Sequence, residues 1–297
     1  ADEFVLSMSQ EQQEWSVSVS EQPIVSAFRG LSAPVKHRDN LTAADNAVLI
    51  ACDDDAYIRY TKSQALWLGL LKDFDAQSDL EVFDKPMRQL LENPALLSVC
   101  MRLPAVRYAQ ELVGGYDFDK LCDNYDMLEV SVAKRWLSQW QECYDFYSGK
   151  LVGGYQWQPA AADARRIRAM ALYYMMISGE VNAQLAVDLY ERCDNLTDRV
   201  AALVALLALP DYDADPVLAD FYKRSQSHDL VMDMWFRIAA TSKQAQPLQW
   251  ISELLLHKDC HWQRPNRIMA CFAGWLSGNF ASLHSADGAG YVLLSDS

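Results

Sequence analysis

From Leu41 onward, apolar residues recur every three or four positions, the spacing of a helix with one buried face. Thr42 is followed three residues later by Asp45, a pair typical of the first turn of a helix, and the apolar run 47–50 comes next. Further blocks of helical length follow to the end of the chain. We expect helices over 55–72, 80–92, 94–101, 104–112, 117–122, 126–148, 160–178, 181–191, 196–208, 214–226, 229–241, 246–257, 264–277 and 279–284.

Proline and glycine, which end or begin helices, separate these blocks at Pro94, Pro104, Gly179 and elsewhere. The connectors are short and no credible strand lies between the helices, which favours stacked helix pairs over one compact bundle. We therefore predict a mainly α fold over residues 39–297, a superhelical array of stacked antiparallel helix pairs similar to HEAT or armadillo repeats.

Residues 1–38 have a different pattern. Trp15, Val17 and Val19 alternate with serines, a period of two that suits a half-buried strand, and 4–6 and 24–28 are further strand candidates. Three short strands cannot bury both faces of a sheet by themselves. We interpret this segment as the last strands of a β-domain that begins before residue 1.

The chain is acidic, with 26 Lys and Arg residues against 40 Asp and Glu residues and a net charge of −14. Such a field repels phosphate backbones and anionic lipids, and the longest basic cluster is Arg165, Arg166 and Arg168. We therefore expect neither nucleic acid nor a membrane surface as a partner. The longest apolar run, over 200–209, has about half the length of a membrane-spanning helix.

Cysteine usage and the N-terminus bear on the compartment. The seven cysteines are scattered singly, without a C-x-x-C pair, and their number is odd. The chain opens with Asp2 and Glu3 and lacks the basic and apolar regions of a signal peptide. We expect a cytoplasmic protein whose cysteines are reduced thiols in the core.

Candidate chemistry centres on residues 257–261. His257 and His261 are four positions apart and could share a helix face as zinc ligands, but Lys258 stands where H-E-x-x-H has its glutamate. Cys260 could act as a nucleophile with one of these histidines as its base. We favour ordinary histidines at a helix end, and we assign no catalytic residue and no metal ligand to this chain.

Three other patterns favour structural roles. The Gly-Ala-Gly segment 288–290 lacks the Lys-Ser/Thr of a phosphate-binding loop and predicts a turn. The acidic triplet 53–55 lacks the spaced oxygens of a calcium loop and is typical of a helix start. Aromatic residues spaced four apart over 136–147 indicate a packing face.

Several segments stand in a familiar order. They are Asn195-Leu196-Thr197-Asp198, Leu230 to Phe236, Pro265-Asn266-Arg267-Ile268 and Leu283 to Tyr291. In content and order they resemble the C-terminal half of the bacterial aminopeptidase N family. Near the start, 28–36 resembles the last strands of that family's immunoglobulin-like domain, and 53–59 and 64–66 resemble the helices after it. The resemblance covers essentially the whole chain.

The resemblance implies a part of a zinc aminopeptidase, an enzyme that removes N-terminal residues from short peptides with water activated on zinc. The family's zinc ligands and amine-recognition loop belong to a catalytic domain upstream of residue 1, so zinc is expected in the longer parent and not in this chain. Residues 1–38 would end an immunoglobulin-like domain. Residues 39–297 would cap the active site, wall the substrate chamber and have the upstream catalytic domain as their partner.

Two departures from the family pattern matter. The family reads Asn-Arg-Ile-Arg, with the second arginine facing the chamber, whereas Asn266, Arg267 and Ile268 are followed here by Met269. Asn266, Arg267 and Met269 are therefore our chamber candidates, Met269 with a thioether in place of a charge. The chain also stops at Ser297, where relatives continue with further helices. We expect the isolated chain to self-associate or to be marginally stable.

Two other functions stay open at this stage. The chain could be a free-standing helical-repeat module, derived from such a peptidase, that binds a partner protein on its concave surface. A catalytic domain encoded directly upstream in the same reading frame would count against this alternative. The least favoured interpretation is an enzyme built on His257, Cys260 and His261, and activity retained after His257→Ala would exclude it.

Overall fold

The computed structural model describes residues 3–35, 37–72, 79–113, 117–209, 212–242 and 246–296. Within these ranges all regular structure is helical. The described part contains two short 3-10 helices, η1 (Arg29–Leu31) and η2 (Asp79–Phe83), and sixteen α-helices. The α-helices are α1 (Ala43–Cys52), α2 (Ala56–Lys72), α3 (Asp84–Leu90), α4 (Pro94–Cys100), α5 (Val106–Val113), α6 (Phe118–Arg135), α7 (Leu137–Gly149), α8 (Pro159–Ile177), α9 (Gln184–Arg192), α10 (Leu196–Leu207), α11 (Asp215–Ser225), α12 (Asp229–Thr241), α13 (Pro247–Leu255), α14 (Pro265–Gly278), α15 (Phe280–Leu283) and α16 (Ala289–Asp296).

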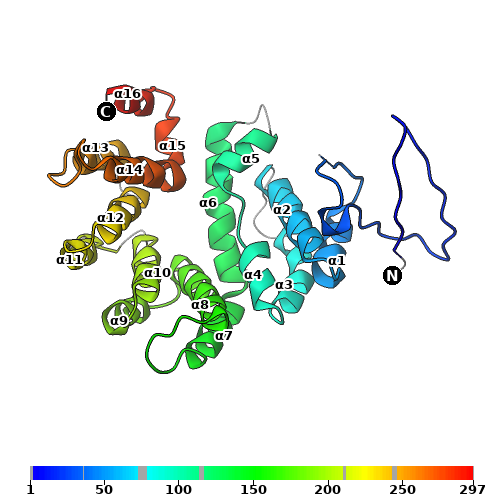
Figure 1. The fold of residues 1–297 in the computed structure, drawn as a ribbon, viewed down its shortest axis with the longest axis horizontal. Coiled ribbons are helices and arrows are strands. Elements are labelled where there is room, and N and C mark those ends of the chain that lie inside the picture. The colour runs from blue at the N-terminus through cyan, green and yellow to red at the C-terminus, as the bar shows by residue number, and fades with distance from the viewer. Residues whose placement is uncertain are drawn as a thin grey trace.

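The helices follow one another around a curve. Each packs mainly against near neighbours in sequence, α1 on α2, α7 on α8, α8 on α10, and α12 on α14. Figure 1 shows that the curve brings the α14–α16 end of the chain round to the side of α6, with α6, α8 and α10 around its inside. The predicted mainly α architecture is thus confirmed.

Local sequence explains where helices begin. Thr42 caps α1: its Oγ1 accepts a hydrogen bond from the backbone N–H of Asp45 at 3.2 Å, and the Asp45 carboxylate accepts one from the Thr42 backbone N–H at 2.9 Å. Asn93 caps α4 by accepting a hydrogen bond from the Leu96 backbone N–H at 3.2 Å, with Pro94 as the first helical residue. Asn195 caps α10. The predicted start of a helix after Thr42 is confirmed.

Two expected helix limits are wrong. The blocks 117–122 and 126–148 were expected as separate helices, but α6 runs through the first gap, and the second block divides at Trp136. Trp136 leaves the helical conformation with φ −113° and ψ 31°, and its indole Nε1–H donates to Asp84 at 3.1 Å. Arg135 pairs with the same carboxylate. The turn between α6 and α7 is therefore fixed by a tertiary contact with α3.

The Gly-Ala-Gly segment is only partly a turn. Gly288 has φ +72°, the left-handed conformation of a turn, but Ala289 begins α16, which the sequence pattern did not predict. The Asp287 carboxylate accepts a hydrogen bond from the Ala289 backbone N–H at 3.0 Å. A Cβ on Gly290 would lie 2.5 Å from a backbone oxygen of α15, so this glycine permits the close approach of α16.

Residues 3–35 and 37–42 form no strand, so the expected strands over 4–6, 15–19 and 24–28 are not seen here. Figure 1 shows the first part of the segment as a long loop outside the helical array. Trp15, Val17 and Val19 are exposed, because no neighbouring strand covers them. Lys36, at the end of the family-like segment 28–36, lies outside the described residues.

Arg29 ties this segment to the helices. Its guanidinium pairs with Asp53, at 2.7 Å, and with Asp54. The third acid of the triplet, Asp55, accepts the backbone N–H of Tyr57 at 2.8 Å in the first turn of α2. The structural interpretation of this triplet is therefore confirmed, with a second role as the anchor of Arg29.

The core is continuous and rich in aromatic side chains. Trp67 stacks on Phe83 with ring centroids 3.7 Å apart, and Trp140 stacks on Tyr174 at 4.7 Å. The aromatic stripe over 136–147 lies largely in this core, as its spacing predicts. Cysteines are free throughout the described part, but Cys52 is exposed, which the expectation of core thiols did not include. None of the described helices has the length and apolar composition to cross a membrane.

Candidate functional site

The three chamber candidates lie at the start of α14 but do not share one environment. Asn266 is exposed, and 64% of the Met269 surface is accessible. Arg267 is buried and holds α14 to its neighbours: its Nη1–H donates to the Asp259 carbonyl and its Nη2–H to the Asp229 carboxylate, both at 2.9 Å. Arg267 therefore has a structural role, and none of the three lines the cavities described below.

The candidates at 257–261 are also held apart from one another. The His257 Nδ1 accepts the backbone N–H of Asp259 at 3.1 Å, and aromatic rings surround this imidazole. Burial lowers the His257 pKa below 6.5. The Cys260 thiol lies 4.0 Å from the Cys271 thiol rather than against a histidine. This arrangement is one of packing, not a nucleophile beside its base.

Metal ligands are likewise not gathered into a site. Nowhere in the described ranges do three or more His, Cys, Asp or Glu side chains stand close enough to hold a metal ion. The resemblance implies zinc in a longer parent, with its ligands upstream of residue 1, and the described residues offer no group that fits it.

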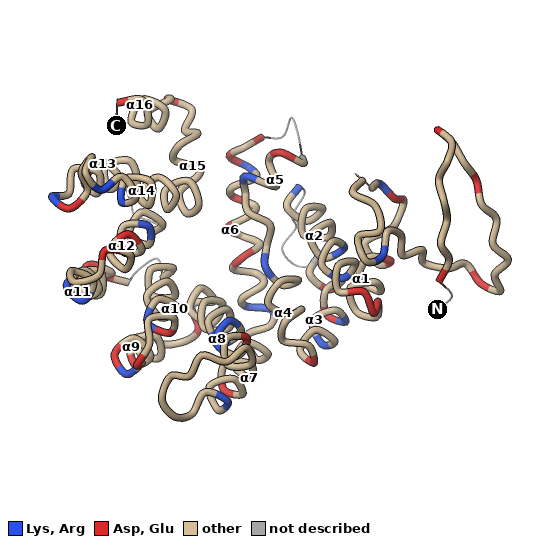
Figure 2. Tube along the Cα trace, in the orientation of Figure 1, with Lys and Arg blue, Asp and Glu red and all other residues tan. Residues whose placement is uncertain are grey.

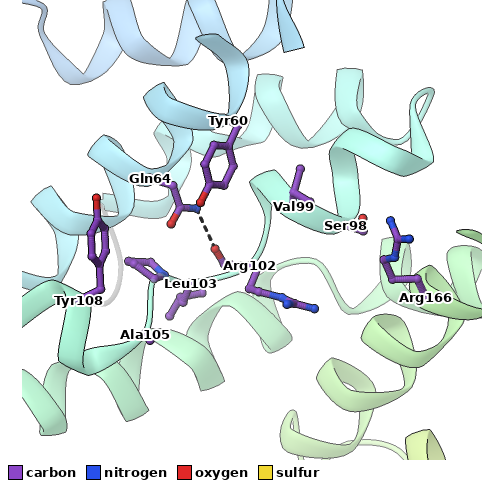
Figure 3. A pocket seen from close by; sticks show the side chains of 10 residues that line it. Tyr60, Gln64, Ser98, Val99, Arg102, Leu103, Ala105, Tyr108 and Arg166 are labelled. Atoms are coloured by element: carbon purple, nitrogen blue, oxygen red, sulfur yellow. Dashed lines mark hydrogen bonds between the residues drawn. The ribbon is translucent and has the colours of Figure 1, made fainter. Parts of the chain in front are cut away.

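Two adjoining cavities, which we call the Arg102 cavities, are the candidate site. The first, of about 570 Å³, lies between α2, α4, α5 and α8. The second, of about 420 Å³, lies between α6, α8 and α10. They share Arg102, Leu103 and Arg166, so these three residues lie where the cavities meet. Figure 3 shows Arg102 extending toward the side of the first cavity on which Arg166 lies.

The segment after α4 positions Arg102. The carbonyls of a helix's last turn have no partners within the helix, and here three consecutive carbonyls accept side-chain donors. Trp67 Nε1–H donates to Cys100 at 2.8 Å, Tyr174 Oη–H donates to Met101 at 3.1 Å, and Gln64 Nε2–H donates to Arg102 at 3.2 Å. These bonds come from α2 and α8 and fix the backbone that carries the guanidinium.

Charge is unevenly divided over the cavities. Arg102 makes no ion pair within the part of the chain that the structure describes, and Arg166 pairs with Asp163 on its own helix at 3.3 Å. In the second cavity, Tyr173 is hydrogen-bonded to the Glu129 carboxylate, and burial together with this carboxylate raises the Tyr173 pKa. The two arginines thus lie where the cavities meet, and the Glu129 carboxylate lines the second cavity.

Sequence reasoning missed this site, although one signal was present. The cluster of Arg165, Arg166 and Arg168 was considered only as a basic patch. On a helix, residues 165 and 168 share a face and residue 166 points elsewhere. Accordingly, Arg165 and Arg168 are buried against Asp198, whereas Arg166 lines the cavities. Arg102 had no such signal, because only the tertiary fold places it beside Arg166.

Comparison with known proteins agrees with this fold. The family model described as "Domain of unknown function (DUF3458_C) ARM repeats" matches residues 43–297. Aminopeptidase N of Caulobacter vibrioides is 25% identical over 290 residues, which are 94% of this chain and 33% of that protein. Aminopeptidase N of Escherichia coli is 25% identical over 285 residues, which are 92% of this chain and 32% of that protein.

A solved structure has the same fold. Aminopeptidase A of Legionella pneumophila, crystallised in complex with aspartic acid, superposes with a TM-score of 0.80 at 22% identity, over 94% of this chain and 34% of that one. The chain thus spans about a third of the length of the relatives that it matches. It belongs to the DUF3458_C family of ARM repeats and is homologous to the C-terminal region of aminopeptidase N.

Proposed function

We propose that this chain is the capping part of a zinc aminopeptidase, that it closes over an active site held by another part of the same polypeptide, and that it forms a wall of the chamber into which peptides enter. The observation that carries the proposal is the match of nearly the whole chain to only a third of each aminopeptidase N. The described residues offer no metal site, so cleavage would depend on residues outside them.

The exposed N-terminal segment supports the proposal that another part of the parent polypeptide packs on it. Phe4, Val5, Val17 and Val19 are exposed in an extended stretch that packs on no sheet. A strand with alternating apolar residues has one apolar face, and it is stable when another element packs on that face. In the proposed parent, residues 1–38 complete an immunoglobulin-like domain, and the helical domain over 39–297 follows it. The exposed segment also supports the expected self-association of the isolated chain.

The exposed residues at the start of α14 remain part of this proposal. Asn266 and Met269 are available to line the chamber, while Arg267 braces α14 from behind. In an active parent, Met269→Arg is expected to change kcat/KM for peptides of several residues and to leave hydrolysis of an alanyl amide unchanged. An equal effect on both substrates would count against a chamber position.

The experiment that tests the function compares two proteins: the purified 297-residue chain, and a version extended upstream in the same reading frame. Zinc content is measured by metal analysis, and activity with chromogenic alanyl and arginyl amides. We expect zinc and cleavage only in the extended version. If the upstream frame encodes no catalytic domain, the chain is the free-standing binding module instead; zinc and activity in the short chain would contradict both interpretations.

A further inference from the structure

Arg102 lines both cavities, and its side chain is exposed. Acidic residues outnumber basic ones by 40 to 26, and Figure 2 shows both kinds spread along the helices. Many exposed arginines pair with a carboxylate. Within the described ranges, Arg102 has no carboxylate partner, and side chains of α2 and α8 donate hydrogen bonds to its own carbonyl and to those of the two residues before it. An exposed guanidinium without a carboxylate partner, carried on a backbone that is held in place, is suited to an anion that comes from outside the molecule.

Arg166 adds a second guanidinium on the same cavity. It extends from α8, and its bond to Asp163 is an exposed contact within one helix at 3.3 Å, which contributes little stability. Arg166 can therefore turn to a ligand at small cost. Two guanidiniums from different elements, α8 and the segment after α4, can bind one carboxylate from two sides.

The cavity walls restrict what can carry that carboxylate. Tyr60, Val99 and Leu103 line the first cavity, and Tyr125, Tyr173 and Ala201 line the second. The walls thus combine apolar surface with phenol rings, and the two volumes together hold several amino-acid residues rather than a small inorganic anion. The Glu129 carboxylate in the second cavity repels negative charge, so the ligand has its anionic end at the arginines.

We propose that the Arg102 cavities bind the C-terminal carboxylate of a short peptide between Arg102 and Arg166, with the peptide's last side chains against the tyrosine and aliphatic walls. This inference rests on the proposed function, because it places the far end of the peptide whose N-terminal end would lie at the active site. In this role the cavities select peptide substrates that have a free C-terminal carboxylate.

The test is direct binding to the full 297-residue chain without zinc, by titration calorimetry at low salt. The probes are an N-acetylated tripeptide with apolar side chains and a free C-terminal carboxylate, the same peptide as its C-terminal amide, and acetate. We expect the peptide acid to bind at least tenfold more tightly than the amide or acetate. Equal binding of acid and amide, or no binding of the acid, would overturn the proposal, and equally tight binding of acetate would assign the site to small carboxylates.

Three charge-matched variants locate the site. Arg102→Gln and Arg166→Gln are each expected to weaken binding of the peptide acid about tenfold and to leave the weak binding of the amide unchanged. Arg107→Gln is the control, because Arg107 is exposed on α5, pairs with Glu111 and lines neither cavity. An equal loss in the Arg107 variant would mean that only net charge matters and would contradict the proposal. Circular dichroism checks that each variant is folded.

The outcome is separable from that of the proposed function. Peptide binding by the short chain with no peptidase activity in the extended version would remove the proposed function and retain a carboxylate-binding cavity. Activity in the extended version, with the acetylated acid and amide bound equally well and their counterparts with a free N-terminus cleaved equally well, would retain the function and remove this inference.

Discussion

The ring of Phe118, the first residue of α6, packs edge-on against His284, directly after α15, with their centroids 5.0 Å apart. Phe118 also contacts Phe280 at 5.6 Å. These two contacts join the middle of the chain to a segment more than 160 residues later. In an array whose helices otherwise pack on near neighbours, they link the two sides of the curve directly (Figure 1).

Phe118→Ala should therefore loosen the far end of the array rather than unfold the whole chain. Aromatic pairs of this geometry contribute roughly 0.5–1.5 kcal/mol each. We expect amide hydrogen exchange over residues 280–296 to accelerate about tenfold, with little change over α1 to α4. Phe146→Ala is the control, because Phe146 is an exposed residue of α7. Unchanged exchange over 280–296 would show that the curve is held without this contact.

A second prediction concerns the contact of α12 with α14. A Cβ on Gly274 would lie 2.1 Å from the Arg237 carbonyl oxygen and 2.9 Å from the Ala240 Cβ, so Gly274→Ala must push the two helices apart. We expect a loss of about 1–3 kcal/mol in the free energy of unfolding, seen as a lower thermal midpoint.

Gly69→Ala is the matched control for that variant. Gly69 is an exposed residue within α2, and nothing lies within 4 Å of an added Cβ. Because alanine restricts the unfolded chain and favours the helix, this variant should be stabilised by about 0.5–1 kcal/mol. A similar fall of the thermal midpoint in both variants would show that the close packing at Gly274 does not cause the destabilisation.

A third prediction concerns the buried ion pairs between α8 and α10. The Asp198 carboxylate lies 2.5 Å from the Arg168 guanidinium and 3.5 Å from that of Arg165, and all three side chains are about nine-tenths buried. Asp198→Asn leaves two buried cations without an anion. Breaking such a group from one side costs roughly 3–5 kcal/mol.

The control makes the same aspartate-to-asparagine substitution in an ion pair at the surface. Asp188→Asn breaks the pair of Asp188 with Arg192, which are exposed neighbours on α9. Such pairs contribute about 0–1 kcal/mol, so the urea midpoint should hardly move, whereas that of the Asp198 variant should fall clearly. Equal midpoints for the two variants would contradict the structural role of Asp198.

How much of this molecule the sequence predicts depends on the range of the interactions involved. Helix starts at Thr42, Asn93 and Asn195 are local chemistry, and the pattern of residues predicts them. The division at Trp136 was missed because it depends on Asp84, which is distant in sequence. The site was missed for the same reason: its cations come from α8 and from the segment after α4, and no motif joins them.

The last prediction is a fall in stability at mildly acidic pH. Burial lowers the pKa of His284 and of His257 below 6.5, and the His284 Nε2 is buried without a hydrogen-bond partner in the described part of the structure. Around His257, Asp259 opposes this shift, and Lys258 and Arg267 reinforce it. In the unfolded chain these imidazoles bind protons at a higher pH than in the folded protein.

The unfolded state therefore holds more protons once the pH falls below about 7, and the free energy of unfolding falls with it. This contribution is complete above the ordinary histidine pKa of 6.5 and is lost as the pH falls through the lower values of the folded protein. As the pH falls, this loss of stability comes before the loss expected from carboxylates such as Asp84, because Arg135 lowers the pKa of Asp84 below 3.8. Urea midpoints measured from pH 8 to pH 5 should fall for the natural chain and fall less for the double variant His257→Gln, His284→Gln. A double variant with the natural slope would show that other groups cause the fall.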